Sequence, residues 1–385
     1  MDSASSIPDY VWKAIDLAQS VPWHMWLVLF VTLFVTGAAL LYSVIFVAAP
    51  VPRAPRSEEE RYITIGLDGK LTSPTALPCW QNKYIHRRRL SLRNDPSKDK
   101  KDVEAADVFV SLVVPAYNEE KRIGVMLEEA TEFLEREYGS TKSSEAQAQE
   151  NGTRQRRPER TTNERGWEIL VVSDGSTDKT ADVALDYARR FPGGRVRVVN
   201  LVTNRGKGGA VTHGMRHVRG QYAVFADADG ASRFADLRHL IAACSQAADE
   251  HGRAVAVGSR AHLVGSDAVV KRSALRNFLM HSFHVLLRLL TPPATSRIKD
   301  TQCGFKLFSR ASLPYIVPHM HSEGWIFDVE MLMLAEVAQI PMVEVPIGWK
   351  EVKGSKLNVI WDSLGMAWGL AILRAAWAVG VYRVS

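Results

Sequence analysis

Charged side chains are missing from one long stretch near the N-terminus, where no Asp, Glu, Lys or Arg occurs between Leu17 and Pro52. Within it, residues 23–49 are almost all apolar. A helix of that length extends about 40 Å, whereas a bilayer core is about 30 Å thick. A cleaved signal peptide would have a basic start and a shorter apolar core. We therefore predict a transmembrane signal anchor at residues 21–50.

Cysteine is also scarce. The chain has 385 residues and only three cysteines, Cys79, Cys244 and Cys303, which are scattered and lack metal-ligand spacing. An odd number of cysteines does not exclude a single disulfide. We predict that they are reduced and that the domain carrying them faces the cytosol.

Common nucleotide-binding and nucleic-acid-binding signatures are absent. The sequence contains no Walker motif and no Gly-x-Gly-x-x-Gly fingerprint after its first strand. No RNA- or DNA-binding motif accompanies the net charge of +6, so nucleic acid is not an expected partner. The modest positive charge instead fits anionic lipid headgroups and sugar-nucleotide phosphates.

The anchor separates a short arm, residues 1–20, from the bulk of the chain. Three arginines follow the anchor within residues 53–61, so the positive-inside rule places the arm in the lumen and the bulk in the cytosol. Residues 51–106 form a juxtamembrane segment that is rich in proline and basic residues. Its basic cluster at 86–89 is either a solvated arm or a contact with anionic lipid.

From residue 107 onward, strands alternate with helices. Apolar, β-branched runs typical of buried strands occupy residues 108–114, 167–172, 195–200, 222–226 and 254–258. The alternation predicts an α/β fold with a mostly parallel sheet flanked by helices, in a domain at 107–360. The polar residues 140–165 are predicted to be a disordered insertion.

Polar segments follow three of these strands, at 115–119, 174–176 and 227–229. The carboxyl ends of parallel strands meet at one edge of a sheet, where ligands gather. Asp227 and Asp229 suit a divalent cation such as Mg²⁺ or Mn²⁺, although an isolated Asp-x-Asp is also typical of a solvated turn. Backbone amides before the helix that begins near Lys207 can hold a diphosphate; the alternative for Lys207 is a solvated loop cation.

Six motifs, in order, resemble those of family 2 glycosyltransferases. They are Val-Val-Pro-Ala-Tyr-Asn-Glu (113–119), Ser-Asp-Gly-Ser-Thr-Asp (173–178), Asn-Arg-Gly-Lys-Gly-Gly-Ala (204–210), Asp-Ala-Asp-Gly (227–230), Gly-Ser-Arg (258–260) and Asp-Thr-Gln-Cys-Gly-Phe-Lys (300–306). The resemblance covers about residues 107–360 and extends to members that use dolichyl phosphate. The Gln-x-x-Arg-Trp motif of processive polysaccharide synthases is absent.

The resemblance implies a glycosyltransferase-A fold, UDP-glucose as the donor and dolichyl phosphate as the acceptor, with inversion at the sugar. It also implies a place in lipid-linked oligosaccharide assembly for N-glycosylation, at the endoplasmic reticulum membrane with the catalytic domain facing the cytosol. Two alternatives are GDP-mannose as the donor and, in a different class, a membrane scaffold with an inactive transferase fold. The sequence leaves the oligomeric state open, including a homo-oligomer.

Site residues carry over from the family by motif. The resemblance places the nucleobase and ribose beside Pro115, Tyr117, Glu119 and Asp174, and the metal on the diphosphate at Asp227 and Asp229. In the family, a third protein ligand sometimes follows two residues later, and here that position is Ala231.

The acceptor phosphate raises a separate requirement, because two anions must be brought together. A phosphate monoester has a second pKa near 6, so it is a dianion at neutral pH and needs no general base. Arg260 and Arg276 are the candidates for meeting its charge; the alternative is two surface arginines without a role. Asp300 either orients an arginine or contacts the sugar, and the sequence does not decide.

Two further segments have helical apolar patterns. Residues 271–290 combine an apolar stripe with basic flanks, which is typical of a helix in the membrane interface or of a core-facing helix. Residues 361–381 are apolar nearly all round, and Arg374 in the middle favours an interface-lying or re-entrant helix over a second span. We therefore predict a membrane-interface helix at 361–385.

Overall fold

The computed structural model describes residues 12, 20–94, 103–139, 165–263, 282–283, 285–352 and 359–383. These residues form two compact units. One comprises the chain up to Ala49 together with Ala375–Arg383, and the other comprises Pro50–Arg374. The predicted insertion at 140–165, apart from residue 165, and most of the predicted helix at 271–290 lie outside the described residues.

The first unit contains the predicted membrane anchor. Helix α2 (Trp23–Ala48) matches the apolar stretch of the sequence, and its 26 residues extend about 39 Å, enough for a bilayer core. Within the described residues it is the one helix long and apolar enough to cross a membrane. The predicted lumenal arm lies almost entirely outside the described residues.

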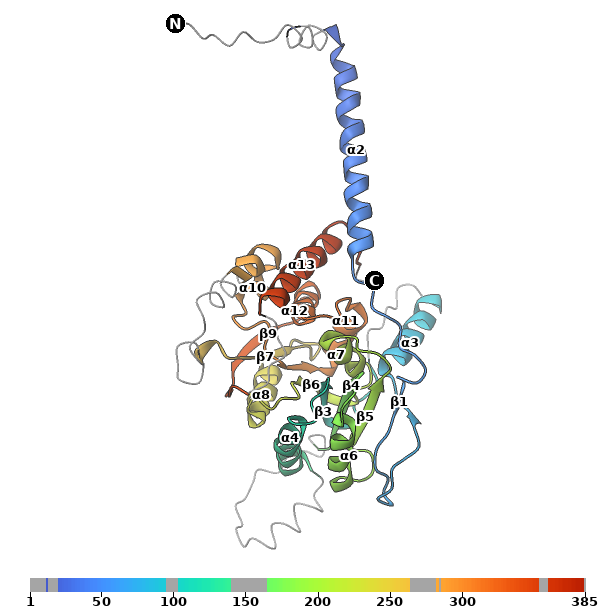
Figure 1. Cartoon of the computed structure of the whole chain (residues 1–385), viewed down its shortest axis with the longest axis vertical. Coiled ribbons are helices and arrows are strands. Elements are labelled where there is room, and N and C mark those ends of the chain that lie inside the picture. Colours follow the sequence, from blue (N-terminus) through green and yellow to red (C-terminus); the bar gives the residue numbers. More distant parts are fainter. Residues whose placement is uncertain are drawn as a thin grey trace. The chain divides into compact units, whose positions relative to one another are not determined.

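The larger unit is built on a seven-stranded sheet with the order β5-β4-β3-β6-β8-β7-β9 (Figure 1). Its strands are β3 (Val108–Ala116), β4 (Trp167–Asp174), β5 (Val196–Leu201), β6 (Gly220–Ala226), β7 (Val255–Ser259), β8 (Phe305–Ser309) and β9 (Met342–Pro346). The sequence predicts β3 to β7 at these places. It misses β8 and β9, because both lie beyond the regular alternation of strands and helices.

All strands of this sheet but one point the same way. The four neighbouring strands β5, β4, β3 and β6 pair in parallel, and so do β7 and β9. β8 is antiparallel to both of its neighbours, β6 and β7. The sheet is therefore mostly parallel, as predicted, and β8 begins at the edge where the other strands end. This reversal adds the loop before β8 to the edge where ligands gather.

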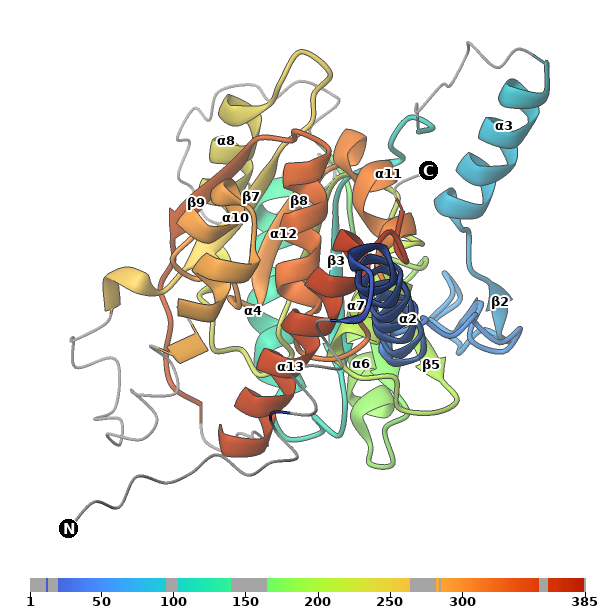
Figure 2. The same ribbon diagram turned by 90° about the horizontal axis from the view of Figure 1, so that it is seen from above.

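Helices cover both faces of the sheet, giving three layers (Figure 1, Figure 2). One face carries α4 (Ile123–Tyr138), α6 (Thr180–Arg190) and α8 (Leu237–Ala247), and the other carries α7 (Lys207–Met215) and α12 (Phe327–Val337). Because successive strand residues point to opposite faces, Val224 of β6 joins the core under α4, whereas Phe225 meets Phe327 with ring centroids 5.7 Å apart. Two short helices, α10 (Pro293–Arg297) and α11 (Leu313–Ile316), pack against α12.

The juxtamembrane segment belongs to the larger unit, which begins at Pro50. The catalytic domain predicted at 107–360 therefore lies inside a larger compact body. Strand β1 (Arg61–Tyr62) pairs with β2 (Thr75–Ala76). Ile63 forms a bridge to Val198 of β5, which joins the segment to the edge of the main sheet.

The basic cluster at 86–89 lies on helix α3 (Trp80–Asn94). The first turn of α3 is anchored, because the indole of Trp80 donates a hydrogen bond to the carbonyl of Met215 at the end of α7, at 2.7 Å. Leu77, just before the helix, packs with Leu170 of β4 and Val199 of β5. The segment is thus folded onto the sheet and onto α7.

Helix α13 (Val359–Ala378) occupies the last predicted segment. Its part in the larger unit buries Leu370 and Leu373, whereas Trp361 and Trp368 are 70% and 66% exposed. A helix with one buried side and exposed tryptophans suits the membrane interface, and this role stays a prediction.

Candidate active site

The carboxyl edge of the sheet gathers the polar segments that the sequence singled out. The turns after β3, β4, β6 and β7, the start of α7 and the loop before β8 all lie there. The first four arrive because parallel strands end at one edge. The loop at 300–304 arrives because β8 runs in the opposite direction.

Asp227 directly follows β6 and is held from two sides. Its backbone N–H donates to the carbonyl of Gly304 at 3.1 Å, and the ammonium of Lys207 lies 2.6 Å from its Oδ1. Glycine at position 304 leaves room for this carboxylate, because an added Cβ would clash with it and displace it. The loop before β8 therefore sets the position of this carboxylate.

Asp229 is the second carboxylate after β6. Its Oδ1 accepts a hydrogen bond from the backbone N–H of Ala231 at 3.0 Å. Burial and the neighbouring charge of Asp227 raise the pKa of Asp229, and the cations Arg122 and Lys207 act against this rise. Two partly exposed carboxylates thus repel one another at this edge and favour a bound cation.

The donor set fits a divalent metal. Asp227 and Asp229 offer hard oxygen atoms, and among the described residues no group of three or more His, Cys, Asp or Glu side chains converges here. Mg²⁺ is commonly held by one or two carboxylates together with waters and substrate phosphates. Two protein carboxylates would therefore suffice, with substrate phosphate and water completing the coordination.

Lys207 is the first residue of α7 and faces the carboxylates rather than open solvent. Burial alone would lower its pKa, but the charges of Asp227 and Asp328 raise it above the usual value. Its ammonium also lies 6.0 Å from the ring centroid of Trp325 and 5.9 Å from that of Phe327. The side chain is 18% exposed, a setting that suits a phosphate ligand better than a solvated loop cation.

A second ion pair lies deeper, between Lys306 of β8 and Asp328 of α12. Both side chains are buried, the Lys306 ammonium contacts the Asp328 carboxylate, and it donates to the carbonyl of Cys303 at 2.6 Å. The charge of Asp328 also raises the pKa of Lys207. Sequence analysis assigns no role to this pair; the signal was a lysine in the motif at 300–306 followed by an acidic helix start.

Asp174, at the end of β4, binds the loop before α7. Its Oδ1 accepts from the N–H of Arg205 at 2.7 Å and its Oδ2 from that of Gly206 at 2.9 Å. Burial raises the pKa of Asp174 to about 6, although both N–H groups act against the rise. Gly206 has φ 85°, a conformation that favours glycine. In the structure Asp174 shapes the phosphate-side loop; a contact with the nucleobase or ribose stays a prediction.

The other predicted nucleotide residues follow β3. Pro115 pairs within the sheet beside Val172, and Tyr117 is 43% exposed at the edge. The carboxylate of Glu119 binds Arg122 through two hydrogen bonds of 2.5 and 2.6 Å. Arg122, which the sequence analysis did not single out, is close enough to sense both Asp227 and Asp229.

Arg260, directly after β7, forms a two-pronged pair with Asp300. Its Nε and Nη2 donate to the carboxylate at 2.7 and 2.9 Å, and its backbone N–H donates at 2.9 Å. Burial would raise the pKa of Asp300, but Arg260 holds it below the usual value. Of the two roles that the sequence left open, Asp300 here orients an arginine. Arg276, the other predicted acceptor residue, lies outside the described residues.

Helix α7 and the turn that follows it carry two buried histidines. The Nε2–H group of His213 donates to the carbonyl of Glu59 at 2.9 Å, and the Nδ1–H group of His217 donates to the carbonyl of Pro78 at 3.0 Å. Burial lowers the pKa of His213 to about 4 and that of His217 to about 3. Both rings are therefore neutral and tie α7 to the N-terminal segment.

We expect these histidines to make the protein less stable as the pH falls below about 6.5, their pKa in an unfolded chain. The histidines of the unfolded chain then bind protons, whereas the buried rings of the folded protein stay neutral. The free energy of unfolding therefore keeps falling until the pH reaches the folded pKa values, about 4 for His213 and about 3 for His217. Each ring contributes roughly 1.4 kcal/mol per pH unit in this window.

Asp174 acts in the opposite direction, because its pKa is raised to about 6 on folding. The informative measurement is therefore thermal unfolding of the wild type beside His217→Gln at pH 7.5 and pH 5. Glutamine keeps an N–H donor for the carbonyl of Pro78 but does not titrate. The variant should lose less stability than the wild type on acidification, and equal losses would contradict the prediction.

Comparison with known proteins shows the family of this chain. The glycosyl transferase family 2 profile matches residues 111–314, more than half of the chain, and the chain belongs to this family. It is a glycosyltransferase with the glycosyltransferase-A fold that its motifs imply. The sequence is 40% identical to dolichyl-phosphate beta-glucosyltransferase of Saccharomyces cerevisiae over 363 residues, covering 92% of this chain and 94% of that protein.

A second relative has the same name. Dolichyl-phosphate beta-glucosyltransferase of Drosophila melanogaster is 38% identical over 355 residues, covering 92% of this chain and 94% of that protein. Among solved structures, glucosyl-3-phosphoglycerate synthase from Mycobacterium tuberculosis aligns with a TM-score of 0.47 and 18% identity, covering 70% of this chain and 80% of that one.

Proposed function

We propose that this chain transfers glucose from UDP-glucose to dolichyl phosphate with inversion, which gives dolichyl β-D-glucosyl phosphate for lipid-linked oligosaccharide assembly. The observation that carries the proposal is the Asp227, Asp229 and Lys207 cluster at the carboxyl edge of the sheet. It occurs in a chain that is 40% identical to a dolichyl-phosphate beta-glucosyltransferase over 92% of its length. The relatives favour this donor over GDP-mannose.

On the donor side, the leaving group is a diphosphate. Mg²⁺ or Mn²⁺ held by Asp227 and Asp229 would supply positive charge to it. Lys207 is placed to donate to the same phosphate oxygens, and the positive end of the α7 helix dipole lies beside it. The nucleobase and ribose would bind at the neighbouring part of the sheet edge, beside Pro115, Tyr117 and Glu119.

On the acceptor side, the phosphate oxygen of dolichyl phosphate forms the new bond to the anomeric carbon as the bond to the diphosphate breaks. The acceptor is already a dianion at neutral pH, so no proton has to be removed from it. Arg260 engages Asp300 through Nε and Nη2, which leaves Nη1 for the incoming phosphate. Arg276 stays the second candidate for this task.

The acceptor also sets the location, because its lipid tail is buried in a bilayer. We place the enzyme in the endoplasmic reticulum membrane, anchored by α2, with the catalytic unit facing the cytosol. The exposed tryptophans of α13, Trp361 and Trp368, suit contact with the headgroup region. A homo-oligomer is compatible with this arrangement.

The direct test uses membranes that contain the protein, dolichyl phosphate and labelled sugar nucleotides. UDP-glucose should give a metal-dependent glucolipid, whereas GDP-mannose should give no product. A mannolipid instead would assign the chain to the mannosyl branch. No transfer from either sugar nucleotide, by a protein that is folded in the membrane, would favour an inactive scaffold.

The orientation predicts the state of one glycosylation sequon, Asn151-Gly-Thr153. Because the catalytic unit faces the cytosol, Asn151 should carry no glycan. Mass spectrometry of the native protein, with and without an endoglycosidase, measures this. A glycan at Asn151 would reverse the orientation and move donor use to the lumen.

A further inference from the structure

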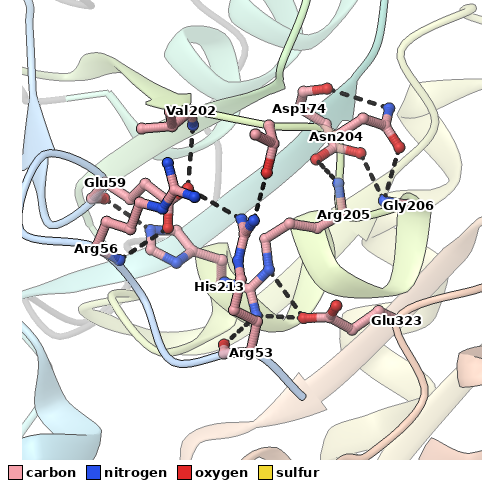
Figure 3. A network of polar contacts seen from close by, with 11 residues as sticks. Arg53, Arg56, Glu59, Asp174, Val202, Asn204, Arg205, Gly206, His213 and Glu323 are labelled. Carbon is pink, nitrogen blue, oxygen red and sulfur yellow. Dashed lines mark hydrogen bonds and ion pairs between the residues drawn. The ribbon is translucent and has the colours of Figure 1, made fainter. Parts of the chain in front are cut away.

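The first residues after the membrane anchor dock on the phosphate-side loop of the active site (Figure 3). Only residues 49–52 lie between the end of α2 and Arg53. Residues 53–59, which we call the strap, contact the loop at 202–206 between β5 and α7. This is the loop whose N–H groups bind Asp174, and it leads directly into Lys207.

Glu59 forms the centre of this contact. It is fully buried, and its Oε1 accepts from the N–H of Val202 at 3.0 Å and from Nη2 of Arg53 at 3.1 Å. Its Oε2 accepts from the N–H of Arg56 at 2.9 Å. Burial would raise the pKa of Glu59, but these donors and the charges of Arg53 and Arg205 hold it below the usual value. The ionised carboxylate thus joins the strap to the loop.

The loop reaches back to the strap through two further side chains. Nη2 of Arg205 donates to the carbonyl of Arg53 at 2.5 Å, and its Nε donates to Glu323 at 2.8 Å. The hydroxyl of Thr203 accepts a hydrogen bond from Arg53. Figure 3 shows these contacts as one network from Glu59 to Glu323, with Asp174 beside it.

We propose that Glu59 is a positioning residue of the donor site, so that the strap next to the membrane anchor helps to build the diphosphate pocket. The loop at 202–206 has no regular hydrogen-bonded partner strand of its own. Its course depends on Asp174 from the sheet side, on Glu323, which binds Arg205, and on Glu59 and Arg53 from the strap side. Without the strap, the loop that leads into α7 and Lys207 would lose one of these supports. The identity of the donor rests on the proposed function; the positioning does not.

The test compares Glu59→Gln with Glu58→Gln in the full chain. Glu58 is the exposed neighbour of Glu59 and is the matched control. Glutamine has one acceptor oxygen, so its amide at position 59 must face the N–H of either Val202 or Arg56. We expect hydrogen exchange of the amides at 202–209 to become about tenfold faster in Glu59→Gln, the effect of losing about one such hydrogen bond.

Kinetics provide the second readout. The KM for UDP-glucose should rise about tenfold in Glu59→Gln, as expected for one lost contact, while the KM for dolichyl phosphate stays unchanged. Glu58→Gln should match the wild type in both. If a folded Glu59→Gln protein exchanges its 202–209 amides at the wild-type rate, the inference is wrong whatever the donor.

Two other outcomes are decisive. If exchange rises in the loop but the wild type does not use UDP-glucose, the proposed function fails and the positioning role stands. If Glu59→Gln does not fold, Arg53→Ala decides, because the Arg53 side chain is 35% exposed and its loss spares the buried carboxylate. Faster loop exchange in Arg53→Ala supports the inference, and unchanged exchange overturns it.

Discussion

Replacing Asp229 with alanine is expected to reduce glucosyl transfer by roughly a thousandfold, because the loss of metal-assisted stabilisation costs several kcal/mol at about 1.4 kcal/mol per factor of ten. The protein should stay folded. Asp229 follows a strand at the sheet edge, and burial and Asp227 already raise its pKa. Removing one of two repelling carboxylates relieves that repulsion rather than breaking the core.

The measurement is initial-rate transfer at saturating UDP-glucose and dolichyl phosphate, beside thermal unfolding of the same preparation. Asp186→Ala is the matched control, since the Asp186 side chain is 72% exposed and pairs with Arg189 on the surface of α6. The control should retain wild-type turnover. Near-normal turnover in Asp229→Ala would show that this carboxylate does not hold the metal.

The largest effect on stability is expected at Asp328. Its carboxylate is the partner of the Lys306 ammonium, and both side chains are buried. Asp328→Ala would leave a buried cation without its partner, which typically costs about 3–5 kcal/mol. The melting temperature should fall by roughly 6–10 °C at about 2 °C per kcal/mol.

A double substitution separates the charge effect from lost packing. Replacing both Asp328 and Lys306, as Asp328→Leu with Lys306→Met, removes the unpaired charge and should restore most of the stability. Activity should not return with it, because Lys207 also senses the charge of Asp328 at the donor site. A single Asp328→Ala protein with wild-type stability would contradict the assignment of a buried pair.

Much of the fold could be predicted from local patterns. The charge-free run before Pro52 is sufficient to predict α2, because the helix length and the bilayer thickness can be compared directly. The β-branched runs predict β3 to β7, because a strand buried on both faces is apolar throughout. The juxtamembrane segment escaped this reasoning, since its contacts join residues far apart in the chain, such as Glu59 and Val202.

The sequence by itself determined the family, the apolar helix long enough to cross a membrane and the candidate metal ligands Asp227 and Asp229, because motifs, apolar runs and strand ends are local features. Only the tertiary structure decided which side chains meet. The antiparallel strand β8 brings Gly304 against Asp227 and gives Lys306 its partner Asp328. Arg260 forms an ion pair with Asp300, and Glu59 of the strap binds the loop that precedes Lys207. Such pairings depend on strand order and direction in the sheet, which arise from packing over the whole chain and are not encoded in any single stretch.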